Sequence, residues 1–289
     1  MIDEQKILNW PFKPVEHAYT SKDSILYALG VGLGGDPLDA AQLRFLFEEQ
    51  PGFAARPTMA VVLAGPGFWV RDPDSGVDWK KVLHGEQGME LHAPLPAEAT
   101  VIGQTRVREI SDKGEGKGAL LYIERTLTDK ATGAKLATLT STTFARGDGG
   151  FGGTPKPQPK APPLPDRAPD MVNSFKTLPQ SALIYRLSGD PNPLHASPEV
   201  AAAAGFKAPI LHGLCSYAVA GLAILRECCA SDPARLKAMS LRFSSPVYPG
   251  ETIRTEIWDE GAGAFAFRAV VEERDVTVLD QGRATVAAA

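Results

Sequence analysis

A proline- and glycine-rich segment divides this chain of 289 residues into two parts. Residues 147–170 hold seven prolines and five glycines, and such a segment neither pairs as a strand nor continues as a helix. We therefore expect an extended connector over 147–170, between an N-terminal unit of residues 1–146 and a C-terminal unit of residues 171–289.

Both units end in runs of residues with strand character. β-branched residues and partial alternation of polar and apolar residues mark these runs, which are separated by short turn sequences. They span residues 100–110, 118–129 and 134–146 before the connector, and 238–248, 251–260, 264–275 and 277–287 after it. The pattern predicts one α+β unit, used twice.

Helical sequences precede the strands of each unit. Residues 21–32 begin with capping residues, and residues 197–206 begin with Ser197 and Pro198, a typical helix start. Residues 210–230 are almost all apolar or small, which indicates a buried helix. We expect a central helix wrapped by an antiparallel sheet in the second unit, and a looser copy in the first.

Composition argues against several classes of function. The net charge of −4 and the lack of a basic tract disfavour a nucleic-acid or membrane-surface partner. No apolar run is long enough to span a bilayer, and the acidic N-terminus is unlike a signal peptide. The three cysteines have no metal-site spacing and fit a reducing compartment, so we expect a cytoplasmic protein.

The string GVGLGG at residues 30–35 has the glycine spacing of a dinucleotide-binding loop. A genuine loop of this kind follows a strand and begins an alternating βαβ chain, whereas here the preceding residues are helical. The better interpretation is a glycine-rich helix exit, and we expect no nicotinamide or flavin.

The string SGDPNPLH places Asp190, Asn192 and His195 within six residues. Pro191 and Pro193 disfavour a helix or an inner strand, so a rigid extended turn could aim the three polar side chains. An acid and an imidazole that meet one small molecule can perform acid–base catalysis. The alternative is an Asx-type turn with a helix-capping histidine.

Two neighbouring features favour catalysis. A helix starts directly after the turn at Ser197, and Gly213 lies near the start of the apolar helix. Glycine there allows close approach of a substrate carbonyl, and backbone N–H groups at a helix N-terminus stabilise negative charge.

The segment YRLSGDPNPLH, followed by AAGFKAPILHGLCSYA, closely resembles the signature of the type 2, or (R)-specific, enoyl-CoA hydratases. These are MaoC-like dehydratases that also occur as a domain of peroxisomal multifunctional enzymes. The resemblance covers nearly the whole chain, including YALGVG, VLHGEQGMELHAPLP, SDKGEGKG and RFSSPVYPGETIRTEIW. It implies a double hotdog fold, in which each of two repeats wraps an antiparallel sheet around a central helix. The N-terminal repeat would be degenerate and hold the acyl chain, and the C-terminal repeat would be catalytic.

The same resemblance assigns roles to individual residues. Asp190 and His195 match the catalytic pair, Asn192 matches an amide that positions them, and Gly213 matches the backbone oxyanion donor. Glu48 matches a glutamate implicated in activity. The residues expected to contact or border the CoA thioester are His84, Gly85, Lys113, Pro191, Pro193, Leu194 and Phe243.

The implied reaction is hydration of trans-2-enoyl-CoA to (3R)-3-hydroxyacyl-CoA, with neither metal nor cofactor, because the CoA thioester is the substrate. A homodimer is the expected assembly. Alternatives are a dehydratase acting on acyl-carrier-protein, branched or sterol side-chain thioesters, and a non-catalytic acyl-CoA-binding protein. The apolar run at residues 58–68 fits an acyl tunnel and a core strand equally well.

Overall fold

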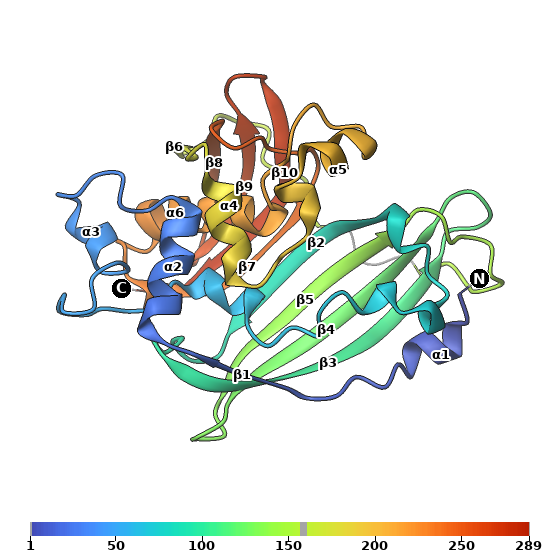
Figure 1. Ribbon diagram of the computed structural model, residues 1–289. Helices are drawn as coiled ribbons and strands as arrows, with labels where there is room; N and C mark the ends of the chain where they lie inside the picture. The colour runs from blue at the N-terminus through green and yellow to red at the C-terminus, as the bar shows by residue number, and fades with distance from the viewer. Residues whose placement is uncertain (1, 157–160, 289) are drawn as a thin grey trace.

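The computed structural model describes residues 2–156 and 161–288, so residues 157–160 of the expected connector lie outside the described residues. The chain forms a long curved sheet, with most of the α-helices gathered at one end and the first, short α-helix at the other (Figure 1). The helices and 3-10 helices (η) are α1 Glu4–Leu8, α2 Ser21–Val31, α3 Ala40–Leu43, η1 Pro57–Val62, η2 Trp69–Arg71, η3 Pro73–Ser75, η4 Trp79–Lys81, α4 Ser181–Tyr185, η5 Arg186–Ser188, η6 Pro193–His195, α5 Pro198–Ala203, α6 Gly213–Cys228 and η7 Pro233–Arg235. The strands are β1 Val15–Tyr19, β2 Val82–Leu91, β3 Ala99–Asp112, β4 Ala119–Asp129, β5 Lys135–Ala145, β6 Met171–Lys176, β7 Leu236–Phe243, β8 Thr252–Gly261, β9 Ala264–Val271 and β10 Val276–Val286.

The sheet consists of two copies of one strand arrangement. Its order is β1-β3-β4-β5-β2-β7-β10-β9-β8-β6, and neighbouring strands are antiparallel. Read outward from the centre, each half runs from its second strand through its fifth, fourth and third to its first. This confirms the predicted duplication of one α+β unit.

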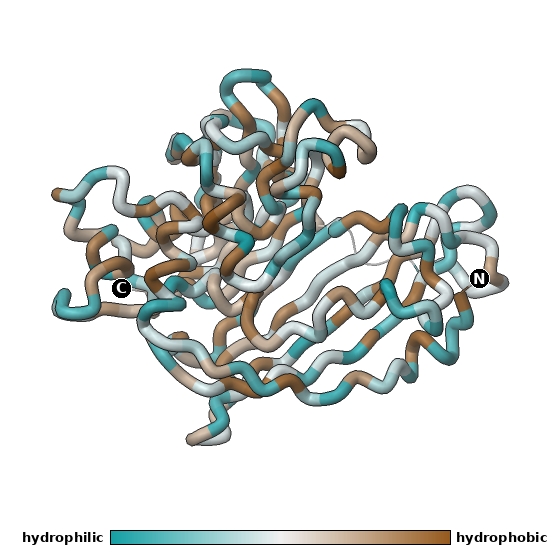
Figure 2. Tube along the Cα trace, in the orientation of Figure 1, coloured by the Kyte–Doolittle hydropathy of each residue, from teal (hydrophilic) through white to brown (hydrophobic). Residues whose placement is uncertain are grey.

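The two copies meet where β2 pairs with β7. In this pairing Glu86 lies opposite Arg242 and Met89 lies opposite Met239. Hydrophobic and hydrophilic residues alternate along much of the long strands, as expected for a sheet with one face against a core (Figure 2). Residues at the ends of β2 and β7 are thereby adjacent although they come from different repeats.

The central helix of the second repeat is α6. Its residues from Cys215 to Leu225 are all buried, and it packs on strands of its own repeat. This matches the helix expected from the apolar run at residues 210–230. Gly221 brings α6 against the first repeat, since a Cβ there would lie 2.6 Å from Thr58 Cγ2.

The first repeat differs from the expected copy. Its long helix, α2, packs on α4, where Gly30 allows an approach so close that a Cβ would lie 3.0 Å from the Tyr185 Cα. Both α2 and the short η1, which lie between β1 and β2 in the chain, contact α6. The run at residues 58–68 is thus no core strand, because Pro57 starts a 3-10 turn and Gly65, Pro66 and Gly67 follow it directly.

The string GVGLGG is a helix exit, as its flanking sequence predicts. Helix α2 ends at Val31, and Gly32 follows in the left-handed conformation with φ of 108°. Its N–H bonds the Leu29 carbonyl, which is a glycine C-cap. In the part of the chain that the structure describes, no helix is long and apolar enough to cross a membrane.

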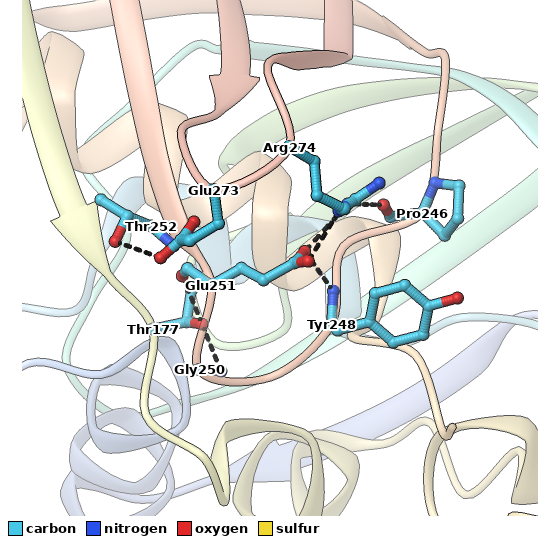
Figure 3. A network of polar contacts seen from close by, with 8 residues as sticks. All are labelled: Thr177, Pro246, Tyr248, Gly250, Glu251, Thr252, Glu273 and Arg274. Atoms are coloured by element: carbon cyan, nitrogen blue, oxygen red, sulfur yellow. Dashed lines mark hydrogen bonds and ion pairs between the residues drawn. The ribbon is translucent and has the colours of Figure 1, made fainter. Parts of the chain in front are cut away.

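A loop between β7 and β8 supports the start of α6. Both carboxylate oxygens of Glu251 accept hydrogen bonds from Arg274, at 2.7 and 2.9 Å, and Arg274 also donates to the Pro246 carbonyl (Figure 3). Within this loop the Val247 carbonyl accepts from the Leu211 N–H at 2.7 Å. The loop therefore fixes the backbone one residue before His212.

Candidate active site

The turn after η5 carries the acid of the site. Gly189 adopts a left-handed conformation that turns the chain, and Asp190 follows, half-buried. The Asp190 carboxylate accepts from the Asn192 N–H at 3.2 Å, and the Asn192 side chain accepts from the Leu194 N–H at 3.0 Å. The alternative Asx turn is thus present, and it presents the acid. The turn is not extended throughout, because Pro193 begins the one-turn helix η6, which ends at His195.

His195 is oriented by one hydrogen bond. Its side chain is 8% exposed, and its Nδ1 lies 2.8 Å from the Ile210 carbonyl oxygen. A carbonyl oxygen can only accept, so Nδ1 carries the proton and Nε2 is left as the acceptor. Burial lowers the pKa of His195, although this hydrogen bond and the Asp190 charge oppose the shift. The imidazole is therefore a neutral base at pH 7.

A second histidine packs on the first. The His195 and His212 rings stack with centroids 3.7 Å apart and planes 27° apart. His212 Nε2 lies 3.2 Å from the Asp190 backbone carbonyl, to which it donates. Burial, followed by the nearby His195, lowers the pKa of His212 to about 4, so this ring is also neutral. We did not expect a role for His212 from the sequence.

The N-terminus of α6 adjoins these side chains. Gly213 is the first residue of α6, directly after His212, and its N–H has no acceptor among the described residues. A Cβ on Gly213 would lie 3.2 Å from the Phe243 ring, so this ring packs directly on the glycine. An N–H at the start of a sixteen-residue helix is a suitable donor to a negatively charged oxygen.

The junction of the two repeats contributes the next residues. The His84 ring at the start of β2 lies 4.8 Å from the Phe243 ring at the end of β7. Gly85 lies at a bulge in β2, where a Cβ would approach the Thr142 carbonyl to 3.2 Å. Although His84 is exposed, desolvation by the surrounding protein lowers the pKa of its ring, and the Asp190 charge opposes this shift.

Comparisons with known proteins agree with this geometry. Residues 160–281 match the model of the MaoC like domain, and residues 17–147 match that of the MFE-2 hydratase 2 N-terminal domain. The chain is 38% identical over 293 residues to a protein named "Probable enoyl-CoA hydratase 2" from Dictyostelium discoideum, with 99% of this chain and 97% of that one covered. The chain belongs to the MaoC-like dehydratase family.

Other members of the MaoC-like dehydratases extend the comparison. "Enoyl-CoA hydratase 2, peroxisomal" from Arabidopsis thaliana is 38% identical, with 91% of this chain and 89% of that one covered. The crystal structure of a MaoC-like dehydratase from Phytophthora capsici superimposes with a TM-score of 0.87 at 40% identity, covering 99% of both chains. A Mycobacterium tuberculosis protein described as a double hotdog fold matches with a TM-score of 0.56 at 16% identity, covering 96% and 94%. The expected double hotdog fold is confirmed.

The remaining predicted site residues of this MaoC-like dehydratase occupy its surface. Asn192, Pro191 and Pro193 are exposed, Leu194 is half-buried, and all four belong to the turn between Asp190 and His195. The Asn192 side-chain amide caps the turn and, among the described residues, bonds neither the Asp190 carboxylate nor the His195 ring.

Lys113 and Glu48 are placed differently. Exposed Lys113 lies with its ammonium 4.9 Å from the centre of the Phe144 ring, and Phe144 pairs with Leu83, the neighbour of His84. Through Phe144 and Leu83, Lys113 therefore lies near His84. Glu48 is exposed in the loop after α3, and no hydrogen bond or ion pair among the described residues joins it to the turn from Asp190 to His195.

Three side chains at the centre of the site are of types that can bind a metal ion. Asp190, His195 and His212 each offer a ligand atom, and these atoms lie within 4.8 Å of one another. However, His195 Nδ1 and His212 Nε2 already bond carbonyl oxygens, and the other His212 ring nitrogen, Nδ1, is buried. The arrangement suits acid–base chemistry better than metal coordination.

Proposed function

We propose that this MaoC-like dehydratase catalyses the reversible hydration of trans-2-enoyl-CoA to (3R)-3-hydroxyacyl-CoA. The observation that carries the proposal is the convergence of three groups: the Asp190 carboxylate, the neutral His195 imidazole and the free Gly213 N–H. The names of the relatives support the same reaction class. Members of that class are hydro-lyases.

The chemistry assigns one task to each group. A water held between Asp190 and His195 loses a proton to this pair as its oxygen forms a bond to C3 of the enoyl thioester. The electrons of the C2–C3 double bond move toward the thioester oxygen, where the Gly213 N–H stabilises the growing charge. The pair then returns a proton to C2, so the atoms of one water are added and the enzyme is regenerated.

Hydrogen-bond polarity supports His195 as the group that accepts the water proton. Its Nδ1–H is held by the Ile210 carbonyl, so Nε2 is unprotonated and available. Burial keeps the ring neutral at pH 7, as a general base requires. Phe243 packs on Gly213 and its ring lies 4.8 Å from the His84 ring, so both side chains are suitably placed to flank the thioester.

The reaction is tested by two measurements on the purified protein. Loss of enoyl-thioester absorbance is followed with crotonyl-CoA and with C8, C10 and branched enoyl-CoAs, and with the matching acyl-carrier-protein thioesters. Chiral analysis of the product then assigns C3. Hydration to the (3R) product supports the proposal, whereas binding without turnover, or an (S) product, contradicts it.

We also infer a homodimer in the cytoplasm. The three cysteines are all unpaired, which is compatible with a reducing compartment, although several relatives are named as peroxisomal. The homodimer rests on the family resemblance alone. Light scattering coupled to gel filtration measures the assembly, and fractionation of the source cells locates the protein.

A further inference from the structure

His212 touches both members of the catalytic pair. Its ring face covers His195 at a centroid distance of 3.7 Å, and its Nε2–H bonds the Asp190 carbonyl at 3.2 Å. The residue is only 1% exposed, and its ring also packs on the Tyr185 ring, with centroids 5.1 Å apart. His212 therefore contacts both a buried tyrosine and the proposed catalytic base.

The backbone around His212 is fixed independently of the side chain. The Val247 carbonyl holds the Leu211 N–H at 2.7 Å, and the His212 carbonyl accepts from the Cys215 and Ser216 N–H groups at the start of α6. The residue therefore joins the turn that carries Asp190, the helix start that carries Gly213, and the His195 ring.

The charged and titratable groups that face His212 are few. Asp190, His195 and Arg186 act on it electrostatically, and Tyr185 packs on its ring. Its Nδ1 is buried and has no hydrogen-bond partner among the described residues. No group there supplies a route for a proton through Nδ1, which argues that His212 acts by position rather than by proton transfer.

We propose that His212 is a positioning residue of the hydration reaction, in which the Nε2–H fixes the Asp190 carbonyl and the ring face fixes the His195 imidazole. This inference rests on the proposed function, because it concerns the same site. The two contacts belong to different parts of one side chain, so two substitutions separate them.

The experiment compares His212→Phe with His212→Gln in the full chain. Phenylalanine keeps a flat ring against His195 but loses the donor to Asp190, whereas glutamine keeps an N–H donor but loses the ring. His92→Phe and His92→Gln are matched controls, because His92 is exposed and bonds only the Thr138 hydroxyl. For each variant the kcat and KM for crotonyl-CoA, the pH profile of kcat/KM and the melting temperature are measured.

Both His212 variants should lose about 10- to 100-fold in kcat, the range of one misplaced catalytic contact, with KM changed less than threefold. In His212→Gln the acidic midpoint of kcat/KM should move upward, because His195 loses the ring that shields it from water. In His212→Phe this midpoint should stay at its wild-type value. The His92 controls should match the wild type in every parameter.

Three results would overturn the positioning role while leaving hydration itself established. These are kcat within twofold of wild type in both variants, equal midpoints in both, or a fall in kcat that only follows a lowered melting temperature. If His212→Gln does not fold, His212→Phe carries the test through its kcat and its unchanged midpoint. A wild-type enzyme that hydrates no enoyl thioester would instead contradict the proposed function.

Discussion

Phe243 lies directly on Gly213: a Cβ added to this glycine would stand 3.2 Å from Cε1 and 3.3 Å from Cδ1 of the Phe243 ring. The two residues belong to the start of α6 and the end of β7, so the contact defines how closely the helix N-terminus approaches the junction between the repeats. The Phe243 ring also contacts the His84 ring.

Gly213→Ala should therefore displace the Phe243 ring and lower kcat/KM for enoyl-CoA by about tenfold or more, because an oxyanion donor typically contributes about 10²–10³-fold. Steady-state kinetics and the melting temperature are measured together. Adding Phe243→Leu to Gly213→Ala should recover stability by removing the crowding. Wild-type kcat/KM in Gly213→Ala would show that this approach is not needed.

Asp190→Asn and His195→Gln should each reduce kcat by about 10²–10⁴-fold, since each removes one acid–base partner. Both replacements are close in size to the original side chains, so the melting temperature should change little. Stopped-flow or steady-state absorbance measures the rate. Asp36→Asn, at an exposed acid far along the chain, serves as the control. Turnover above a tenth of wild type in either site variant contradicts the assignment.

The rate should depend on pH through His195. Burial lowers the pKa of His195 below the usual 6.5, and the neutral form is the active base. As the pH falls from 8, kcat/KM should decline with a midpoint below pH 6.5. A pH profile from 4.5 to 8 gives the midpoint, and a midpoint at or above 6.5 would exclude His195 as this base.

Stability should also fall in acid. His195 and His212 have lowered pKa values in the folded protein, to about 4 for His212, whereas an unfolded histidine titrates near 6.5. Below pH 6.5 the unfolded chain binds more protons, so the stability contributed by a neutral buried histidine is complete above pH 6.5 and is lost toward pH 4. Each histidine should lower the free energy of unfolding by up to about 1.4 kcal/mol per pH unit in that window. Denaturant titrations at successive pH values measure the slope, which should be shallower in His212→Phe; an equal slope would contradict the shift.

The network in Figure 3 should stabilise the protein measurably. Arg274→Met removes two bonds to Glu251, whose side chain is 12% exposed, and leaves that carboxylate without its cation. We expect a loss of about 2–3 kcal/mol in the free energy of unfolding. Lys130→Met is the comparison, because the Lys130–Glu16 pair is about half exposed and should contribute less than about 1 kcal/mol. Equal losses in the two variants would show that the loop network has no special role.

Local features of the sequence predicted much of the fold. Strands were predicted at the places of β3, β4, β5, β7, β8, β9 and β10, and the α6 helix and the Gly32 helix exit also lie where apolar runs and capping residues indicated. Strands β1, β2 and β6 were not predicted. These features depend on contacts between residues close in the chain, which is why the sequence is informative about them. The same holds for the turn from Asp190 to His195, whose two Asx bonds span only two residues each.

Other features depend on contacts between distant segments. No local pattern shows that η1 packs on α6 beside α2, since this follows from the contact between Gly221 and Thr58. His212 was missed for the same reason: the string LHG marks its position, but only folding places its ring on His195 and its Nε2–H on Asp190.

The sequence by itself determined the duplicated α+β unit, the buried helix and the residues of the catalytic turn, because periodicity, capping and proline stiffness act over a few residues. Only the tertiary structure decided which of these residues meet. The pairing of β2 with β7 brings His84 to Phe243, and the packing of α6 below that junction brings Gly213 to the same ring. Such contacts are set by the register of strands from two repeats and by side-chain volume, and neither can be read from neighbouring letters of the chain.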